Sequence, residues 1–241
     1  MVMAAGHGTR MRPLTQDRSK AMVEVAGKPL IDHMLDRLEA AGITKAVVNV
    51  HAHADHLEAH LGKREGALEI VISDERDQLL ETGGGVVKAL PLLGDPPFLV
   101  CNIDAVWTEF TPVIEALLET WDEDSMCDLM LLAPADRCLG YDGRGDFDMD
   151  AQGRLSWRAG DTADWVYAGV QIFKPARIRN YPVEPFSRTV IWKKNIGRGR
   201  SYGLPIPGYW MHVGTPDAVP AAEAVIRVDG ELERAPKAQR G

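Results

Sequence analysis

A glycine-rich segment near the start of the chain has the composition of an anion-binding loop. Residues 4–14 read AAGHGTRMRPL and directly follow a short apolar run. Gly6 and Gly8 allow the backbone to turn sharply and to approach a ligand closely, and successive backbone N–H groups in such a turn form a concave site for anions. Arg10 and Arg12 can add positive charge to that site. We therefore expect this loop to bind phosphate groups, against the alternative of a plain surface turn.

The loop differs from the two common phosphate-binding motifs. Met11 takes the place of the third glycine in the dinucleotide-binding pattern G-x-G-x-x-G, and the pattern G-x-x-x-x-G-K-[ST] occurs nowhere in the sequence. The missing glycine disfavours a dehydrogenase.

Two charged residues stand where they can complete a phosphate site. Lys20 lies eight residues after Arg12, between the loop and an apolar segment. Asp104 directly follows the apolar run FLVCNI, at the strand end where open α/β sheets bind ligands. A carboxylate there suits Mg²⁺, which takes one or two protein oxygens together with phosphates and water. The alternatives are a solvent-exposed lysine and an aspartate that caps a turn.

A second glycine cluster, ETGGG at residues 81–85, precedes a helical pattern. Successive glycines lose much backbone entropy on folding. We expect them to admit a ligand closely, and the alternative is an ordinary loop before a helix.

Composition narrows the class of ligand. The 241 residues carry 27 Lys and Arg against 35 Asp and Glu, a formal net charge of -8. Such a chain is a poor candidate for binding nucleic acid, so a small local group of positive charges must hold any anion.

Three widely spaced cysteines form no metal or redox pattern, and no run of about 18 apolar residues predicts a membrane span. We expect a cytoplasmic protein without a membrane partner. The short first apolar run leaves open whether residues precede Met1.

Four histidines crowd between residues 51 and 60, and His56 and His60 have the i,i+4 spacing of a metal pair. Without further ligands nearby, we expect a solvated helix face.

Apolar patterning predicts alternating strands and helices in the first half of the chain. The second half adds an antiparallel hairpin over 143–157. The expected fold is α/β: a Rossmann-like mixed, mainly parallel sheet flanked by helices, with a small β-rich lobe at roughly 140–205. We expect one domain over 1–228 and a mobile tail over 229–241. The predicted strands are 1–5, 45–50, 68–73, 98–103, 128–133, 165–173 and 209–213, and the predicted helices are 29–41, 55–61, 86–93, 112–121, 187–196 and 216–228.

Several of these segments together resemble one enzyme family, the sugar-1-phosphate nucleotidyltransferases, over roughly residues 1–228. They are AAGHGTRMRPLT, the lysine eight residues after Arg12, VAGKPLIDHML, ETGGG and NID. Within the family, LLETGGGVVKALPLLGDPPFLVCNID, GRGDF and VGTPD are similar to the uridylyltransferases that act on N-acetylmuramate 1-phosphate in peptidoglycan recycling. The resemblance implies that UTP and this sugar phosphate give UDP-N-acetylmuramate and pyrophosphate with Mg²⁺.

The resemblance also implies residue roles. Arg10 would bind the β- and γ-phosphates, Lys20 would stabilise charge near the α-phosphate, and Asp104 would hold the metal. The implied nucleotide contacts are Ala4, Ala5, Gly6, Gly8 and Thr9. The implied sugar contacts are Glu81, Gly84, Asn102, Asp146 and Gly169.

His212 stands where the family commonly has a second metal-binding aspartate. Neutral imidazole suits softer metals than Mg²⁺. Three interpretations stay open: Asp104 alone holds Mg²⁺ with the phosphates, His212 admits Mn²⁺ or another metal, or the site is degraded. We favour the first. The rival functions are a guanylyltransferase acting on mannose or heptose 1-phosphate, and a catalytically impaired domain that senses nucleotide sugars. We expect a monomer or a small homo-oligomer.

Overall fold

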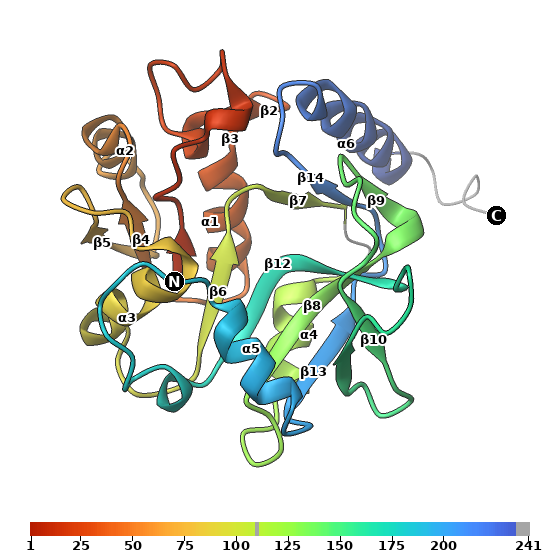
Figure 1. Ribbon diagram of the computed structural model, residues 1–241. Coiled ribbons are helices and arrows are strands. Elements are labelled where there is room, and N and C mark those ends of the chain that lie inside the picture. The colour runs from red at the N-terminus through yellow and green to blue at the C-terminus, as the bar shows by residue number, and fades with distance from the viewer. Residues whose placement is uncertain (109–110, 235–241) are drawn as a thin grey trace.

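Apolar residues that alternate along short strands build a central sheet with helices on both faces. In β4 (Lys45–Val50), Val48 packs in one hydrophobic cluster and its neighbour Val47 in another, as the two faces of a strand require. The computed structural model describes residues 1–108 and 111–234, apart from the side chains of 229–234. It shows three layers (Figure 1).

The central sheet has nine strands and a parallel core. Strand β1 lies between β4 and β6 and runs parallel to both, with Val2 opposite Val48 and Cys101. Strands β12 and β8 continue the sheet in antiparallel pairing beyond β6. Besides β4, the strands are β1 (Val2–Met3), β5 (Glu69–Asp74), β6 (Phe98–Asn102), β8 (Asp128–Pro134), β10 (Phe147–Met149), β11 (Leu155–Trp157), β12 (Trp165–Phe173) and β13 (Ser201–Pro205).

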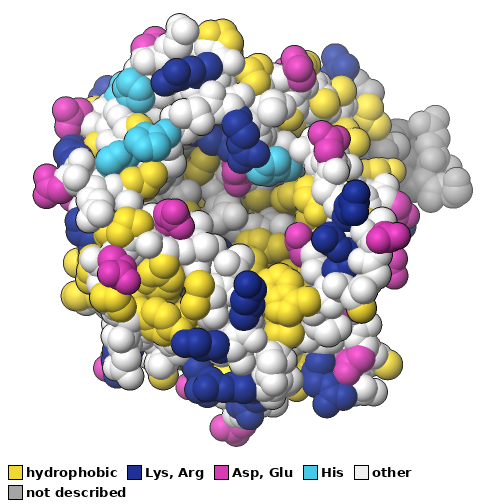
Figure 2. Space-filling view, viewed as in Figure 1, with side chains coloured by type: hydrophobic (Ala, Val, Ile, Leu, Met, Phe, Trp, Pro, Cys, Tyr) yellow, Lys and Arg dark blue, Asp and Glu magenta, His cyan; other side chains and the backbone are white. Residues whose placement is uncertain are grey.

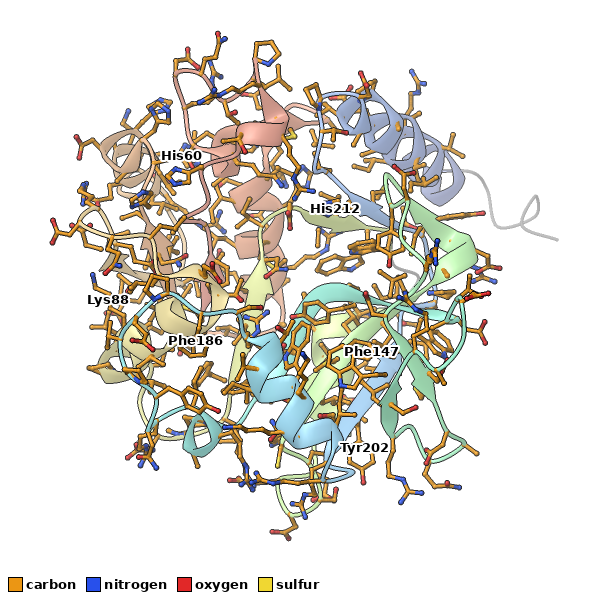
Figure 3. All side chains as sticks on the ribbon, in the orientation of Figure 1. His60, Lys88, Phe147, Phe186, Tyr202 and His212 are labelled. Carbon is orange, nitrogen blue, oxygen red and sulfur yellow. The ribbon has the colours of Figure 1, made fainter. Side chains whose placement is uncertain are left out.

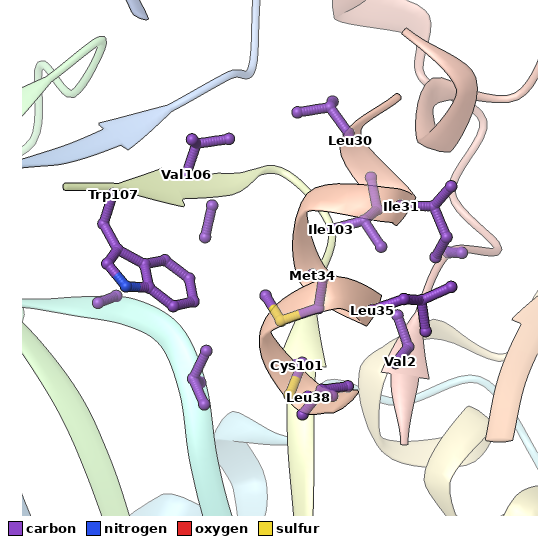
Figure 4. Close-up of a cluster of buried hydrophobic side chains, with 14 of the residues drawn as sticks. Val2, Leu30, Ile31, Met34, Leu35, Leu38, Cys101, Ile103, Val106 and Trp107 are labelled. Atoms are coloured by element: carbon purple, nitrogen blue, oxygen red, sulfur yellow. The ribbon is translucent and has the colours of Figure 1, made fainter. Parts of the chain in front are cut away.

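Helices cover the two faces of this sheet unequally. The larger apolar cluster joins the sheet to α1 (Leu30–Ala40), α2 (Ala54–Leu61) and α4 (Val113–Thr120). Figure 4 shows the inner face of α1, with Leu30, Met34 and Leu38, against side chains of the sheet and Trp107. On the opposite face lie α3 (Glu81–Leu93) and α5 (Thr189–Ile196).

Smaller elements surround the carboxyl edge of the parallel strands. A three-stranded sheet places β14 between β7 and β9, and the last helix, α6, packs against it. These elements are β7 (Ala105–Trp107), β9 (Cys138–Leu139), β14 (Trp210–His212), α6 (Ala218–Arg234), the β2 (Glu24–Val25) and β3 (Lys28–Pro29) hairpin, and the 3₁₀ turns Thr9–Met11, Lys20–Met22, Ala135–Arg137 and Pro175–Arg177.

Most predicted elements are confirmed, and the mixed α/β fold with them. The strands over 45–50 and 165–173 have the predicted bounds, and 143–157 contains an antiparallel hairpin. Strands β12 and β13, within the predicted lobe at 140–205, pair with strands of the main sheet. Helix α6 continues past Val228 to Arg234, and residues 235–241 of the predicted tail lie outside the described residues. Within the described chain, no helix is long and apolar enough to cross a membrane.

The predicted start of α3 is also wrong. Helix α3 begins at Glu81 and not at Val86, so the glycine cluster lies inside the helix. A Cβ on Gly83 would lie 2.3 Å from the ring of Phe186, and one on Gly84 would lie 2.1 Å from the carbonyl oxygen of Glu184. These glycines therefore admit the protein's own segment 184–186, which packs directly on the helix.

This contact predicts that Gly84→Ala destabilises the fold. Alanine favours a helix over glycine by about 1 kcal/mol, but the new methyl group would overlap the Glu184 carbonyl, and overpacking costs about 1–3 kcal/mol. We expect a lower free energy of unfolding in urea for G84A. Gly160→Ala is the control, because a Cβ there meets no atom closer than 3.7 Å. A G84A protein as stable as the wild type would contradict the packing of 184–186 on α3.

Candidate active site

The glycine-rich loop is held open by contacts at both of its ends. It leaves β1 after Met3 and enters a 3₁₀ turn through Gly8, whose φ of 62° lies in the left-handed region that glycine adopts easily. The hydroxyl of Thr15 donates to the carbonyl of Gly8 over 2.8 Å, and Met11 is fully buried beneath the turn. At Gly6, by contrast, an added Cβ would meet no atom within 4 Å. The backbone of the loop is therefore held in place at Gly8, while open space remains beside Gly6.

A buried amide fixes where the loop starts. The side-chain oxygen of Asn49, on β4, accepts hydrogen bonds from the backbone N–H groups of Ala4 (2.7 Å) and Ala5 (3.3 Å). Its nitrogen donates to Glu75 over 2.7 Å, and the other oxygen of Glu75 accepts from the N–H of Leu80. These hydrogen bonds were not predicted from the sequence, although Asn49 is a polar residue in an apolar strand. They tie the loop to the region just before α3.

Lys20 and Asp104 form the central ion pair of the site. The ammonium of Lys20 lies 2.8 Å from a carboxylate oxygen of Asp104, although 84 positions separate the two in sequence. Burial is the largest single influence and would raise the pKa of Asp104, but the charge of Lys20, the nearby His212 and the hydrogen bonds to the carboxylate together outweigh it, so the pKa is lowered. Asp104 is therefore ionised at neutral pH.

His212 faces the same carboxylate from β14. Its Nδ1 lies 3.9 Å from Asp104, and its ring stacks on Trp210 with 5.8 Å between centroids. Burial lowers the pKa of His212 more than the carboxylate of Asp104 raises it. The imidazole is therefore neutral at pH 7, and Lys20 supplies the positive charge beside Asp104.

Two open cavities meet at this ion pair. The loop cavity, of about 430 Å³, is lined by the glycine-rich loop, Lys20, Asn49 and the start of α3. The aromatic cavity, of about 570 Å³, is lined by rings from the second half of the chain. Figure 2 shows the hollow on this face, with cationic, histidine and acidic side chains at its upper edge and hydrophobic ones below. Both cavities are lined by Arg10, Asn102, Asp104 and Gly214.

The aromatic cavity combines aromatic rings with polar and charged side chains. Figure 3 places His212 above this cavity and Phe147 below it. Asp146 accepts a hydrogen bond from the N–H of Tyr167 over 2.9 Å, and burial raises its pKa. Gly169 has a φ of 88°, and a Cβ there would lie 3.0 Å from that of Ala105. The cavity is also lined by Tyr141, Trp157, Trp192 and Trp210.

The structure brings most of the predicted site residues together. Gly84 lies against the backbone of Glu184 and lines neither cavity, so the structure gives it a packing role. Glu81 lines the loop cavity and not the aromatic one, with a left-handed φ of 57°. The others divide between the loop cavity (Ala4, Ala5, Gly6, Gly8, Thr9, Lys20), the junction (Arg10, Asn102, Asp104) and the aromatic cavity (Asp146, Gly169, His212).

The possible metal-binding side chains around Asp104 suit a cation that takes few ligands from the protein. Within the described residues, no group of three or more His, Cys, Asp or Glu side chains is placed to hold a metal ion. His60 lies 2.9 Å from Asp32, so it does not combine with His56 in such a group. Asp104 offers one hard carboxylate beside the loop cavity, which fits Mg²⁺ completed by phosphate oxygens and water.

Comparisons with known proteins agree with this geometry. A model of the nucleotidyl transferase family matches residues 1–136. The chain is 52% identical to the N-acetylmuramate alpha-1-phosphate uridylyltransferase of Caulobacter vibrioides, over 93% of this chain and 95% of the relative. It is 27% identical to the mannose-1-phosphate guanylyltransferase catalytic subunit beta of Danio rerio, over 90% of this chain and 61% of that one.

The fold also matches a solved structure. A putative glucose-1-phosphate thymidylyltransferase from Bacillus anthracis superposes with a TM-score of 0.79 at 18% identity, covering 94% of both chains. With a family model over more than half of its length and a close relative over most of it, the chain belongs to the nucleotidyl transferase family, as a sugar-1-phosphate nucleotidyltransferase.

Proposed function

We propose that the protein converts UTP and N-acetylmuramate 1-phosphate into UDP-N-acetylmuramate and pyrophosphate. The main structural support for this type of reaction is that two cavities meet at Asp104, which is paired with Lys20. One cavity has a phosphate-type loop and the other has aromatic walls, so a nucleotide and a sugar phosphate can meet there. The choice of uridine and of the muramate sugar is supported by the relative that is 52% identical.

The chemistry needs positioning and charge, not a general base. An oxygen of the sugar phosphate attacks the α-phosphorus of UTP, the bond from that phosphorus to the oxygen bridging to the β-phosphate breaks, and pyrophosphate leaves with the electron pair. The nucleophile is already an anion at neutral pH, so catalysis rests on holding two polyanions together. Backbone N–H groups of the loop and Arg10 hold the triphosphate, and the Lys20 ammonium stabilises the charge around the α-phosphorus.

Magnesium is the metal that we propose for this site, with Mn²⁺ as a possible substitute. Asp104 would hold it, and the bound ion would supply positive charge to the phosphates. Neutral His212, 3.9 Å from Asp104, is better placed to pack beside the carboxylate than to replace a hard oxygen ligand.

The proposed substrates place the reaction in peptidoglycan recycling in the cytoplasm. We propose that the protein acts there as a monomer or small homo-oligomer, without a nucleic-acid or membrane partner.

With Mg²⁺, the purified protein should release pyrophosphate from UTP and N-acetylmuramate 1-phosphate faster than from GTP with mannose or heptose 1-phosphate. A coupled pyrophosphate assay over this panel measures the preference. A higher kcat/KM with GTP would favour the guanylyltransferase. Tight nucleotide binding without turnover in either Mg²⁺ or Mn²⁺ would favour a sensing domain, against which the joint presence of Arg10, Lys20 and Asp104 argues.

Lys20→Met should lower kcat about 10²- to 10³-fold, because it removes the ammonium that stabilises the transition state in a partly water-excluded site. The KM for UTP should change much less. Lys28→Met is a matched control, since Lys28 pairs with Asp36 at an exposed position away from both cavities. A K20M enzyme within threefold of wild-type kcat would rule out this role.

The proposed metal site predicts different effects for substitutions of Asp104 and His212. Asp104→Ala should abolish Mg²⁺-dependent turnover, whereas His212→Ala should retain most of it, because a neutral imidazole contributes little to binding Mg²⁺. Initial rates against Mg²⁺ and Mn²⁺ concentration measure both effects. Equal loss in the two variants would show that His212 is a metal ligand.

A further inference from the structure

A buried arginine close to both cavities forms no direct ion pair with any residue that the structure describes. Arg188, directly before α5, is only 2% exposed. Its backbone N–H donates to the hydroxyl of Thr82, which lines the loop cavity. The next residue, Thr189, lines the aromatic cavity. The start of α5 therefore stands at the boundary between the nucleotide side and the sugar side of the site.

The guanidinium of Arg188 is poorly satisfied. Its Nε and Nη1 are buried without a hydrogen-bond partner in the described part of the chain. Nη2 donates to the hydroxyl of Tyr167 over 3.3 Å, and this is the one side-chain hydrogen bond recorded for it among the described residues. The buried carboxyl of Asp128 is occupied by Ser201 and Asn195. The charge of Arg188 acts on the Asp128 carboxylate, but no carboxylate in the described chain bonds the guanidinium directly, and buried N–H groups without a partner are unfavourable. An anion from outside the protein would add negative charge beside this cation.

The aromatic cavity is where such an anion can arrive. Tyr167 and Trp192 both line it, and the guanidinium carbon of Arg188 lies 6.0 Å and 5.5 Å from the centroids of their rings. Arg188 therefore stands directly behind this wall. The Tyr167 hydroxyl accepts from Arg188 and keeps its own proton available for a ligand. Burial raises the pKa of Tyr167, so the hydroxyl stays protonated at neutral pH.

We propose that Tyr167 and Arg188 select sugar 1-phosphates that carry a second anionic group on the sugar. Tyr167 donates to that group, and Arg188 positions the hydroxyl and supplies the compensating charge. This inference rests on the proposed function: the lactyl ether of N-acetylmuramate carries a carboxylate, whereas N-acetylglucosamine 1-phosphate is the same sugar without it. A neutral sugar leaves the guanidinium unpaired, and a site with an unpaired buried group discriminates strongly against such a ligand.

The test compares kcat/KM for these two sugar phosphates with UTP and Mg²⁺. The wild type should prefer the acidic sugar, and Arg188→Gln should lower the ratio about 30-fold, mainly through the KM of the acidic sugar, because it removes the compensating charge and the bond that positions the Tyr167 hydroxyl. Arg188→Lys should restore part of the ratio because it keeps the charge. Tyr167→Phe, which retains the ring, should lower the ratio about tenfold and decides the question if R188Q does not fold.

Arg64→Gln is the matched control, since Arg64 is another shielded arginine but pairs with Asp36 and Glu39 away from both cavities. It should leave the ratio unchanged even where it lowers the melting temperature. A ratio within threefold of wild type in R188Q, or in Y167F where R188Q does not fold, would overturn this inference and leave the proposed function intact. A wild type that forms no product from UTP and N-acetylmuramate 1-phosphate would overturn both.

Discussion

The ion pair between Lys20 and Asp104 connects the other parts of the site. It joins the segment after the glycine loop to the turn after β6, and the backbone of Asp104 also bonds Val213 just beyond β14. The chain as a whole is acidic, with a formal net charge of -8. It can hold two polyanionic substrates only where the fold concentrates cations and N–H groups. The charge of Lys20 helps to keep the carboxylate of Asp104 ionised at neutral pH.

Much of the fold could be predicted because its signals are local. The runs at 45–50 and 165–173 are rich in β-branched and aromatic residues, and both are strands with the predicted bounds. The start of α3 could not be predicted, because its glycines are required by residues 184–186, about a hundred positions away. Strand β13 was missed for a similar reason: SYGLP contains Gly and Pro and has little strand character until it pairs with β8.

The site divides in the same way. The loop, Lys20 and Asp104 could be predicted from the sequence, because glycines and charged residues directly beside apolar runs mark the ends of buried strands. Asn49, Tyr167 and Arg188 act through contacts between distant segments, and nothing in their immediate sequence marks them except a polar residue in an apolar strand at Asn49. Buried polar networks of this kind depend on tertiary structure. The sequence therefore reveals the residues of the glycine-rich loop and its charged neighbours more readily than the buried residues that hold other side chains in place.

The packing of segment 184–186 on the first turn of α3 has a consequence for how the enzyme can diversify. The same stretch of chain leads directly into Arg188 and α5, while Glu81 and Thr82 in the first turn of α3 line the loop cavity. The walls of the two cavities are thus joined through one packed contact and cannot change independently. Substitutions in residues 184–189 that reshape the aromatic cavity must also preserve the packing on α3, whose first turn lines the loop cavity.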